Sequence, residues 1–267
     1  MLGAVVQAQI ENNVDNSTQL QTIARHLMAQ RDSALPKSDL PAGLALKDSE
    51  ESFAVQKLMI ALNDQQVYGW KCLLPLDDGS IILAPLLSKP YAFTQTCELY
   101  TQNNKARVEP EIAFVFGQDL LATENYSHEQ VDAAIAKTHM ALELIQNRFS
   151  DDYQPTHFEK LADGLFNQGI VIGPEINKAD AFDAAQIELT IEQNEHRNTR
   201  TGKHPSGLAQ APVYWAVNYL AQLGIDIKAG QVFITGSYSG VIDLDTDSSC
   251  VISYAGLGEY SITFTAR

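Results

Sequence analysis

The stretch that most strongly indicates the fold is Arg107-Val108-Glu109-Pro110-Glu111-Ile112-Ala113-Phe114-Val115-Phe116-Gly117. Its apolar second half is typical of an interior β-strand. Side chains alternate between the two faces of a strand, so Glu109 and Glu111 lie on the same side. Pro110 has no amide donor, which indicates an edge or a bulge of the kind found beside functional sites. The stretch therefore predicts two converging carboxylates, and a solvent-facing acidic pair is the alternative.

Strand patterns continue on both sides of this stretch, and short polar or glycine turns separate the C-terminal ones. Such a meander differs from a βαβ series, which favours the α+β class over a parallel doubly wound sheet. The predicted strands are Gln66–Leu74, Ile81–Leu86, Ala106–Phe116, Gly169–Ile172, Gln186–Glu192, Gln231–Thr235, Val241–Leu244, Cys250–Tyr254 and Tyr260–Thr265.

Four helices are predicted from apolar residues at helical spacing. Two of them form an N-terminal helical layer over residues 1–65, and residues 66–267 form the larger, strand-rich part of the chain. The first helix is capped by Asn16 or Ser17, and the loop between the first two contains Pro36, Pro41 and Gly43. The four predicted helices are Asn16–Arg31, Ser49–Asp64, His128–Phe149 and Ser206–Leu223.

Composition narrows the classes of partner. The chain has 33 acidic and 18 basic residues, a formal net charge of −15, and no Lys/Arg cluster, which disfavours a nucleic-acid partner. No window approaches the roughly 18 apolar residues that span a bilayer, and Met1–Gln9 lacks the basic segment of a secretory signal. We therefore expect a cytoplasmic protein without a membrane partner. Three widely spaced cysteines, Cys72, Cys97 and Cys250, are predicted core thiols.

A third carboxylate, Glu143, lies in the most apolar part of the predicted helix His128–Phe149. A buried charge has to be paired or bound to a metal ion, whereas an exposed position on an amphipathic helix is the alternative. Glu109, Glu111 and Glu143 together offer only oxygen donors. Such a set selects Mg²⁺ or Mn²⁺ over zinc.

Three other positions are candidates for contact with a substrate. Lys71 lies in an apolar strand, where a lysine either reaches solvent or meets an anion and can exchange protons. His204 precedes a helix and could orient a substrate, although a structural role is common for such a histidine. The turn after the strand Gln231–Thr235 offers Thr235 and Ser237 to a carboxylate, and a plain glycine turn explains it equally well.

In this order, several segments resemble the 2-keto-4-pentenoate hydratase / 4-oxalocrotonate decarboxylase family of the fumarylacetoacetate hydrolase superfamily. The resemblance covers roughly Ser17 to Phe264 and implies a compact β-roll with flanking helices, a homo-oligomer, and bound Mg²⁺ or Mn²⁺. The segments are Gly69-Trp70-Lys71, Val108-Glu109-Pro110-Glu111-Ile112-Ala113-Phe114-Val115, Ala141-Leu142-Glu143-Leu144, Ala162-Asp163, Lys203-His204-Pro205 and Lys228-Ala229-Gly230-Gln231-Val232-Phe233-Ile234-Thr235-Gly236-Ser237.

The resemblance assigns roles to individual residues. Glu109, Glu111 and Glu143 match the metal ligands, and Lys71 matches the active-site lysine. Asp163, Phe166, His204, Thr235 and Ser237 are the residues expected to contact substrate. Two departures stand out: Gln146 replaces an aspartate, and Gly164-Leu165-Phe166-Asn167 replaces Asn-Ala-Ser-Ser.

The implied function is a hydratase that adds water to a small anionic 2-hydroxy-2,4-dienoate (2-oxo-4-pentenoate-like) and yields a 4-hydroxy-2-oxo acid. The metal acts as a Lewis acid on the substrate oxygens, and Lys71 carries a proton or contacts the carboxylate. Decarboxylation of a 2-oxo-enedioate (4-oxalocrotonate-like) is the first alternative. A non-catalytic metal-binding or ligand-binding protein is the second, motivated by the departures at Gln146 and at Gly164 to Asn167.

Overall fold

The structure is a computed structural model that describes residues 17–31 and 37–267. The chain forms two compact units. One combines the described residues up to Gln66 with Asn147–Leu165, and the other combines Val67–Gln146 with Phe166–Arg267. The N-terminal layer expected over residues 1–65 is thus joined by a segment from the middle of the chain.

The first unit is helical and contains a helix over residues 17–31, α2 (Ser49–Leu62) and α4 (His157–Asp163). Both predicted N-terminal helices are confirmed over their described residues, whereas Asn16, one of the proposed caps, lies outside them. Asp48 caps α2 by accepting the amide proton of Glu51, as expected of an aspartate at that position. The capping box at Thr156 and Glu159 starts α4, a helix that the sequence analysis missed.

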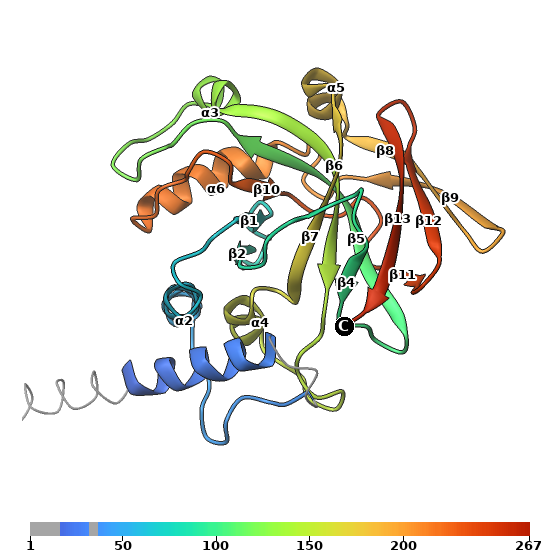
Figure 1. The fold of residues 1–267 in the computed structure, drawn as a ribbon. Coiled ribbons are helices and arrows are strands. Elements are labelled where there is room, and N and C mark those ends of the chain that lie inside the picture. Colours follow the sequence, from blue (N-terminus) through green and yellow to red (C-terminus); the bar gives the residue numbers. More distant parts are fainter. Residues whose placement is uncertain (1–16, 32–36) are drawn as a thin grey trace, which may run out of the picture. The chain divides into compact units, whose positions relative to one another are not determined.

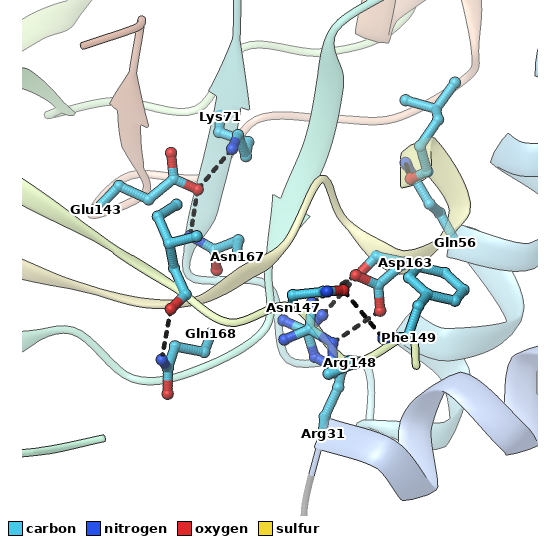
Figure 2. A network of polar contacts seen from close by, with 12 residues as sticks. Arg31, Gln56, Lys71, Glu143, Asn147, Arg148, Phe149, Asp163, Asn167 and Gln168 are labelled. Atoms are coloured by element: carbon cyan, nitrogen blue, oxygen red, sulfur yellow. Dashed lines mark hydrogen bonds and ion pairs between the residues drawn. The ribbon is translucent and has the colours of Figure 1, made fainter. Parts of the chain in front are cut away.

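A buried ion pair holds the first unit together. The guanidinium group of Arg148 donates to both carboxylate oxygens of Asp163, from Nε at 2.8 Å and from Nη2 at 2.7 Å. Arg31 adds a bond from Nη1 to the Asp163 carbonyl oxygen at 2.8 Å (Figure 2). Bidentate geometry of this kind offsets much of the cost of burying two charges.

The second unit contains two sheets, which confirms the α+β class. The larger is mixed, with the order β2-β1-β10-β5-β6-β7-β3, and β11 also pairs with β5 (Figure 1). Its long strands β5, β6 and β7 pair antiparallel, so that β6 has a neighbour on each side. The strands are β1 (Gly69–Cys72), β2 (Leu83–Leu86), β3 (Tyr91–Ala92), β5 (Lys105–Phe116), β6 (Ile135–Ile145), β7 (Asn167–Ile176), β10 (Val232–Ile234) and β11 (Ile242–Asp245).

The smaller sheet has the order β4-β13-β12-β8-β9. Its strands are β4 (Cys97–Leu99), β8 (Gln186–Gln193), β9 (His196–Lys203), β12 (Ser249–Tyr254) and β13 (Gly258–Ala266). The helices α3 (His128–Ala134), α5 (Lys178–Asp183) and α6 (Ala211–Gln222) complete the unit. The predicted C-terminal meander is right only for the hairpin β12–β13, because β10 and β11 pair with β5 in the larger sheet.

The predicted helix His128–Phe149 is wrong over most of its length. Helix α3 ends at Ala134, and residues Ile135–Ile145 form strand β6. In the second half of β6, residues 140–145 are all buried, so both faces are covered and no polar alternation is present. Such a run has the same apolar pattern as a buried helix. Glu143 therefore lies on a strand and not on a helix.

Helix α6 starts at Ala211, five residues after the predicted start, and Pro212 in its first turn suits that position. All three cysteines are free and buried, which confirms them as core thiols. Within residues 17–31 and 37–267, no helix combines the length and the apolar character needed to cross a membrane.

Candidate metal centre

Three glutamates from two adjacent strands meet in the larger sheet. Glu109 and Glu111 lie on one face of β5, and Glu143 on β6 stands directly opposite Glu109 in the antiparallel register. One carboxylate oxygen from each residue lies within 4.8 Å of the others. Glu111 and Glu143 are buried, and Glu109 is half-buried. The predicted convergence of the three carboxylates is thus present in the structure.

Burial and mutual repulsion make this cluster unfavourable for three negative charges. Burial and the neighbouring Glu143 raise the pKa of Glu109 to about 7, against the opposing charge of Lys71. Burial, Glu143 and Glu109 raise the pKa of Glu111 well above its ordinary value. Like charges held this close need protons or a cation. A divalent ion would remove that repulsion directly.

Lys71 is the cation of this site in the structure. It lies on β1, and its Nζ donates to Oε1 of Glu143 at 2.6 Å (Figure 2). Its side chain is 12% exposed, so it does not extend into bulk solvent. Burial lowers the pKa of Lys71, but the charges of Glu143 and Glu109 outweigh burial and leave the pKa above its ordinary value. The ammonium form is therefore the resting state.

Asn167 is a site residue that the sequence analysis did not place. Its Nδ2 donates to the same Oε1 of Glu143 at 2.9 Å (Figure 2). It also donates to the carbonyl oxygen of Gly169 at 3.1 Å. Asn167 is the first residue of β7 and pairs with Ile145 of β6, which brings the amide beside the carboxylate. The position had been recorded only as a departure from the family pattern. No signal in the sequence alone links it to Glu143.

The second oxygen of Glu143 has a different environment. Its Oε2 is buried and accepts no hydrogen bond from any of the described residues. A buried carboxylate oxygen without a donor is costly unless an ion or water satisfies it. Together with the all-oxygen donor set, this atom fits a hard divalent cation held by Glu109, Glu111 and Glu143.

The turn after β10 contacts the cluster through its backbone. The amide of Gly236 donates to Oε2 of Glu111 at 2.7 Å. Thr235, which is fully buried, lies one residue earlier. The Ser237 hydroxyl lies 3.3 Å from the carbonyl oxygen of Pro110 and 3.2 Å from that of Gly240, both of which are acceptors for it. The structure thus brings the Gly236 amide to the cluster. Substrate contacts of Thr235 and Ser237 stay predictions.

His204 supports this turn. Its Nδ1 accepts the amide proton of Ser206 at 3.2 Å, which assigns the ring proton to Nε2, and Nε2 lies 3.3 Å from the Thr235 hydroxyl oxygen. Burial lowers the pKa of His204 to about 4, although a hydrogen bond with Thr235 opposes the shift. These contacts match the structural alternative considered for this histidine. A direct substrate contact stays a prediction.

His204→Gln is expected to reduce the loss of stability in mild acid. A histidine with a depressed pKa in the folded state stabilises the protein above its unfolded pKa of about 6.5, and that stability is lost as pH falls toward about 4. Between pH 7.5 and 4.5, the wild-type free energy of unfolding should fall by about 2–3 kcal/mol more than that of the variant. Urea titrations at both pH values measure this. His196→Gln, at an exposed position of β9, is the control and should behave like wild type.

Asp163 and Phe166 have separate surroundings. Asp163 belongs to the first unit, where both its carboxylate oxygens bind Arg148. Phe166 ends a run of three left-handed residues, Gly164, Leu165 and Phe166, with φ of 87°, 56° and 66°. Each non-glycine residue there costs roughly 1–2 kcal/mol of backbone strain. Strain of this kind is common beside functional sites, and the substrate contacts of both residues stay predictions.

Comparisons with known proteins agree with this geometry. The 2-hydroxyhexa-2,4-dienoate hydratase of Comamonas testosteroni is 28% identical over 163 residues, 60% of this chain and 60% of the relative. The 2-oxo-hept-4-ene-1,7-dioate hydratase of Escherichia coli is 27% identical over 168 residues, 59% of this chain and 61% of the relative. The chain thus matches about three fifths of the length of these curated relatives.

The fold has a solved counterpart. The structure of 4-oxalocrotonate decarboxylase from Pseudomonas putida G7, complexed with magnesium and adipate, superposes with a TM-score of 0.72 at 16% identity, over 93% of this chain and 98% of that chain. The model of the fumarylacetoacetate (FAA) hydrolase C-terminal family matches residues 89–264, which include all three glutamates of the cluster. Since this match covers most of the chain and the fold agrees with it, the protein belongs to the fumarylacetoacetate hydrolase family.

Proposed function

We propose that this protein is a divalent-metal-dependent hydratase of a small 2-hydroxy-2,4-dienoate. The observation that carries the proposal is the buried cluster of Glu109, Glu111 and Glu143 with the ammonium group of Lys71 beside it. The names of the curated relatives, which are hydratases of 2-hydroxydienoates and related 2-oxo acids, support the substrate class. The three glutamates would hold Mg²⁺ or Mn²⁺.

The bound ion would act as a Lewis acid on the substrate oxygens. The glutamates fix its position, and Asn167 and Gly236 orient two of the carboxylates. Lys71 lies where it can hold the substrate carboxylate or donate a proton. In the net reaction, the 2-hydroxyl group loses its proton as a proton adds at C5, and water then adds its hydroxyl group at C4 and a proton at C3. The product is a 4-hydroxy-2-oxo acid.

Two other functions remain alternatives to this proposal. Decarboxylation of a 2-oxo-enedioate would use the same ligands and the same lysine. A non-catalytic metal-binding or ligand-binding role is motivated by Gln146 and by Gly164 to Asn167, where the chain departs from the family pattern. A cytoplasmic location and a homo-oligomeric assembly belong to the proposal, and chromatography with light scattering tests the assembly.

The deciding assay follows the ultraviolet absorbance of 2-hydroxypenta-2,4-dienoate after the protein and Mg²⁺ are mixed. Loss of absorbance together with a 4-hydroxy-2-oxo acid in the product spectrum supports hydration, and addition of a chelator should stop the reaction. Release of carbon dioxide from a 2-oxo-enedioate, without hydration of the monoacid, would support decarboxylation instead. If neither the dienoate nor the 2-oxo-enedioate is turned over with Mg²⁺ or with Mn²⁺, the result would support the non-catalytic role.

A further inference from the structure

The second unit contains a hollow of about 650 Å³ beside the hairpin that joins β1 and β2. Residues 73–78 of this hairpin line it, together with Pro205 and Ser206. A turn shapes the hairpin tip, because the amide of Gly79 donates to the Leu76 carbonyl oxygen and that of Ser80 donates to the Asp78 carboxylate. The hollow is therefore bounded by hydrogen-bonded backbone on this side.

The hollow begins next to the carboxylate cluster. Leu73 donates its amide proton to the carbonyl oxygen of Ile82 and so continues the β1 ladder, which directs its side chain to the same face as Lys71. A Cβ atom added to Gly236 would lie 2.5 Å from Cδ2 of Leu73 and 3.0 Å from Cγ of Pro205. Two walls of the hollow thus press against Gly236, whose amide binds Glu111.

The lining is apolar with a negative rim. Leu74 and Leu76 are 36% and 46% exposed, although both are large apolar side chains. Asp77 and Asp78 provide two carboxylates, and no lysine, arginine or histidine is among the described residues that line the hollow. An apolar group placed here would cover exposed leucine, whereas an anionic group would lie near two like charges without a counterion among the lining residues.

We infer that this hollow receives the tail of the substrate and selects an uncharged, apolar tail against one that ends in a second carboxylate. The inference rests on the function proposed above and narrows it to monocarboxylic dienoates. A hydrophobic pocket discriminates one methylene by about 10-fold to 200-fold, and we expect at least the lower value against a terminal carboxylate. The charged end of the substrate binds at the cluster, and the hollow rejects a second charged end.

Binding of two matched 2-oxo acids to the Mn²⁺-loaded protein tests this selection without requiring turnover. 2-Oxopentanoate and 2-oxoglutarate have the same five-carbon chain and differ only in the terminal carboxylate of the latter. Calorimetric titration should show that 2-oxopentanoate binds at least about 10-fold more tightly. Equal affinity, or tighter binding of 2-oxoglutarate, would overturn the inference.

A positive charge introduced into the lining should weaken the selection. Ser206→Lys places an ammonium group at the wall, and we expect the preference for 2-oxopentanoate to fall by about 10-fold, because the second carboxylate gains a counterion. Ser261→Lys, at an exposed position of β13 that does not line the hollow, makes the same chemical change and should leave the preference unaltered. Equal effects of the two substitutions would show that an added positive charge acts through the overall electrostatic field of the protein, and this would contradict the inference.

The two proposals fail in different ways. Binding that favours 2-oxopentanoate, combined with no turnover of any dienoate, would support the selective hollow and overturn the hydratase. Turnover of a 1,7-dioate at the rate of 2-hydroxyhexa-2,4-dienoate would support the hydratase and overturn the selection. If the Mn²⁺-loaded protein bound neither oxo acid, the selection would be overturned, and turnover of the dienoate would still decide the hydratase.

Discussion

Glu111→Ala is expected to abolish metal-dependent turnover while the fold is kept. The variant removes one of three carboxylates whose oxygens lie within 4.8 Å of one another. Loss of a residue that only orients a metal ligand typically lowers metal affinity by about 10-fold to 100-fold, so loss of a ligand itself should lower the affinity for Mn²⁺ by more than about 100-fold. Because the lost group is a buried like charge, the metal-free protein should unfold at the same or a higher temperature. Initial rates with Mg²⁺ and Mn²⁺ titration measure both effects.

Thermal stabilisation by the metal gives a readout that does not depend on substrate. At a free concentration of 100 times Kd, Mn²⁺ should stabilise the wild-type protein by about 2.7 kcal/mol, and Glu111→Ala at the same concentration by much less. Glu188→Ala, which removes an exposed glutamate of β8, is the matched control and should retain wild-type metal binding and turnover. Full activity in Glu111→Ala would rule out the three-glutamate site.

Lys71→Met should lower turnover by about 10²-fold or more and leave metal binding intact. Methionine keeps an unbranched apolar side chain in a position that is largely buried, but it cannot donate a proton or hold a carboxylate. The three glutamates remain, and loss of a neighbouring positive charge favours a cation at the cluster. Lys71→Arg should restore little of the turnover, since arginine keeps the charge but does not release its proton.

Lys137→Met is the matched control for this prediction. Lys137 is an exposed lysine on β6 of the same sheet, and it forms an ion pair with Glu175 at 2.7 Å. Surface pairs of this kind contribute little to stability, so turnover and metal affinity should stay at the wild-type level. Near-normal turnover in Lys71→Met would leave Lys71 as a structural partner of Glu143 only.

Glu143 is a buried site residue on a strand, although its sequence surroundings predict a helix. Glu143 was selected because an apolar run surrounds it, and the structure confirms its burial. The run was assigned to a helix, but it forms the strand β6 between β5 and β7. A strand covered on both faces has lost the alternation that identifies strands, whereas burial leaves the same composition in either element.

The contacts that support the three carboxylates could not be predicted from the sequence. Asn167 and Gly236 bind the carboxylates, yet the first was noted only as a departure and the second only as part of a glycine turn. The contact of the His204 ring with the Thr235 hydroxyl also appears only in the structure, and a substrate contact of His204 stays a prediction. Each of these contacts joins positions far apart in the chain, and no local pattern encodes such a distance.

The α+β class, the same-face placement of Glu109 and Glu111, and the all-oxygen character of the cluster can all be derived from the order of the residues. These properties depend on the two-residue period of a strand and on the chemistry of the side chains. The register that sets Glu143 opposite Glu109, and the approach of Lys71 to within 2.6 Å of Glu143, exist only in the folded chain. Register is a property of two paired strands. It is set when the apolar faces of all the strands in a sheet are buried together, which no single strand specifies alone.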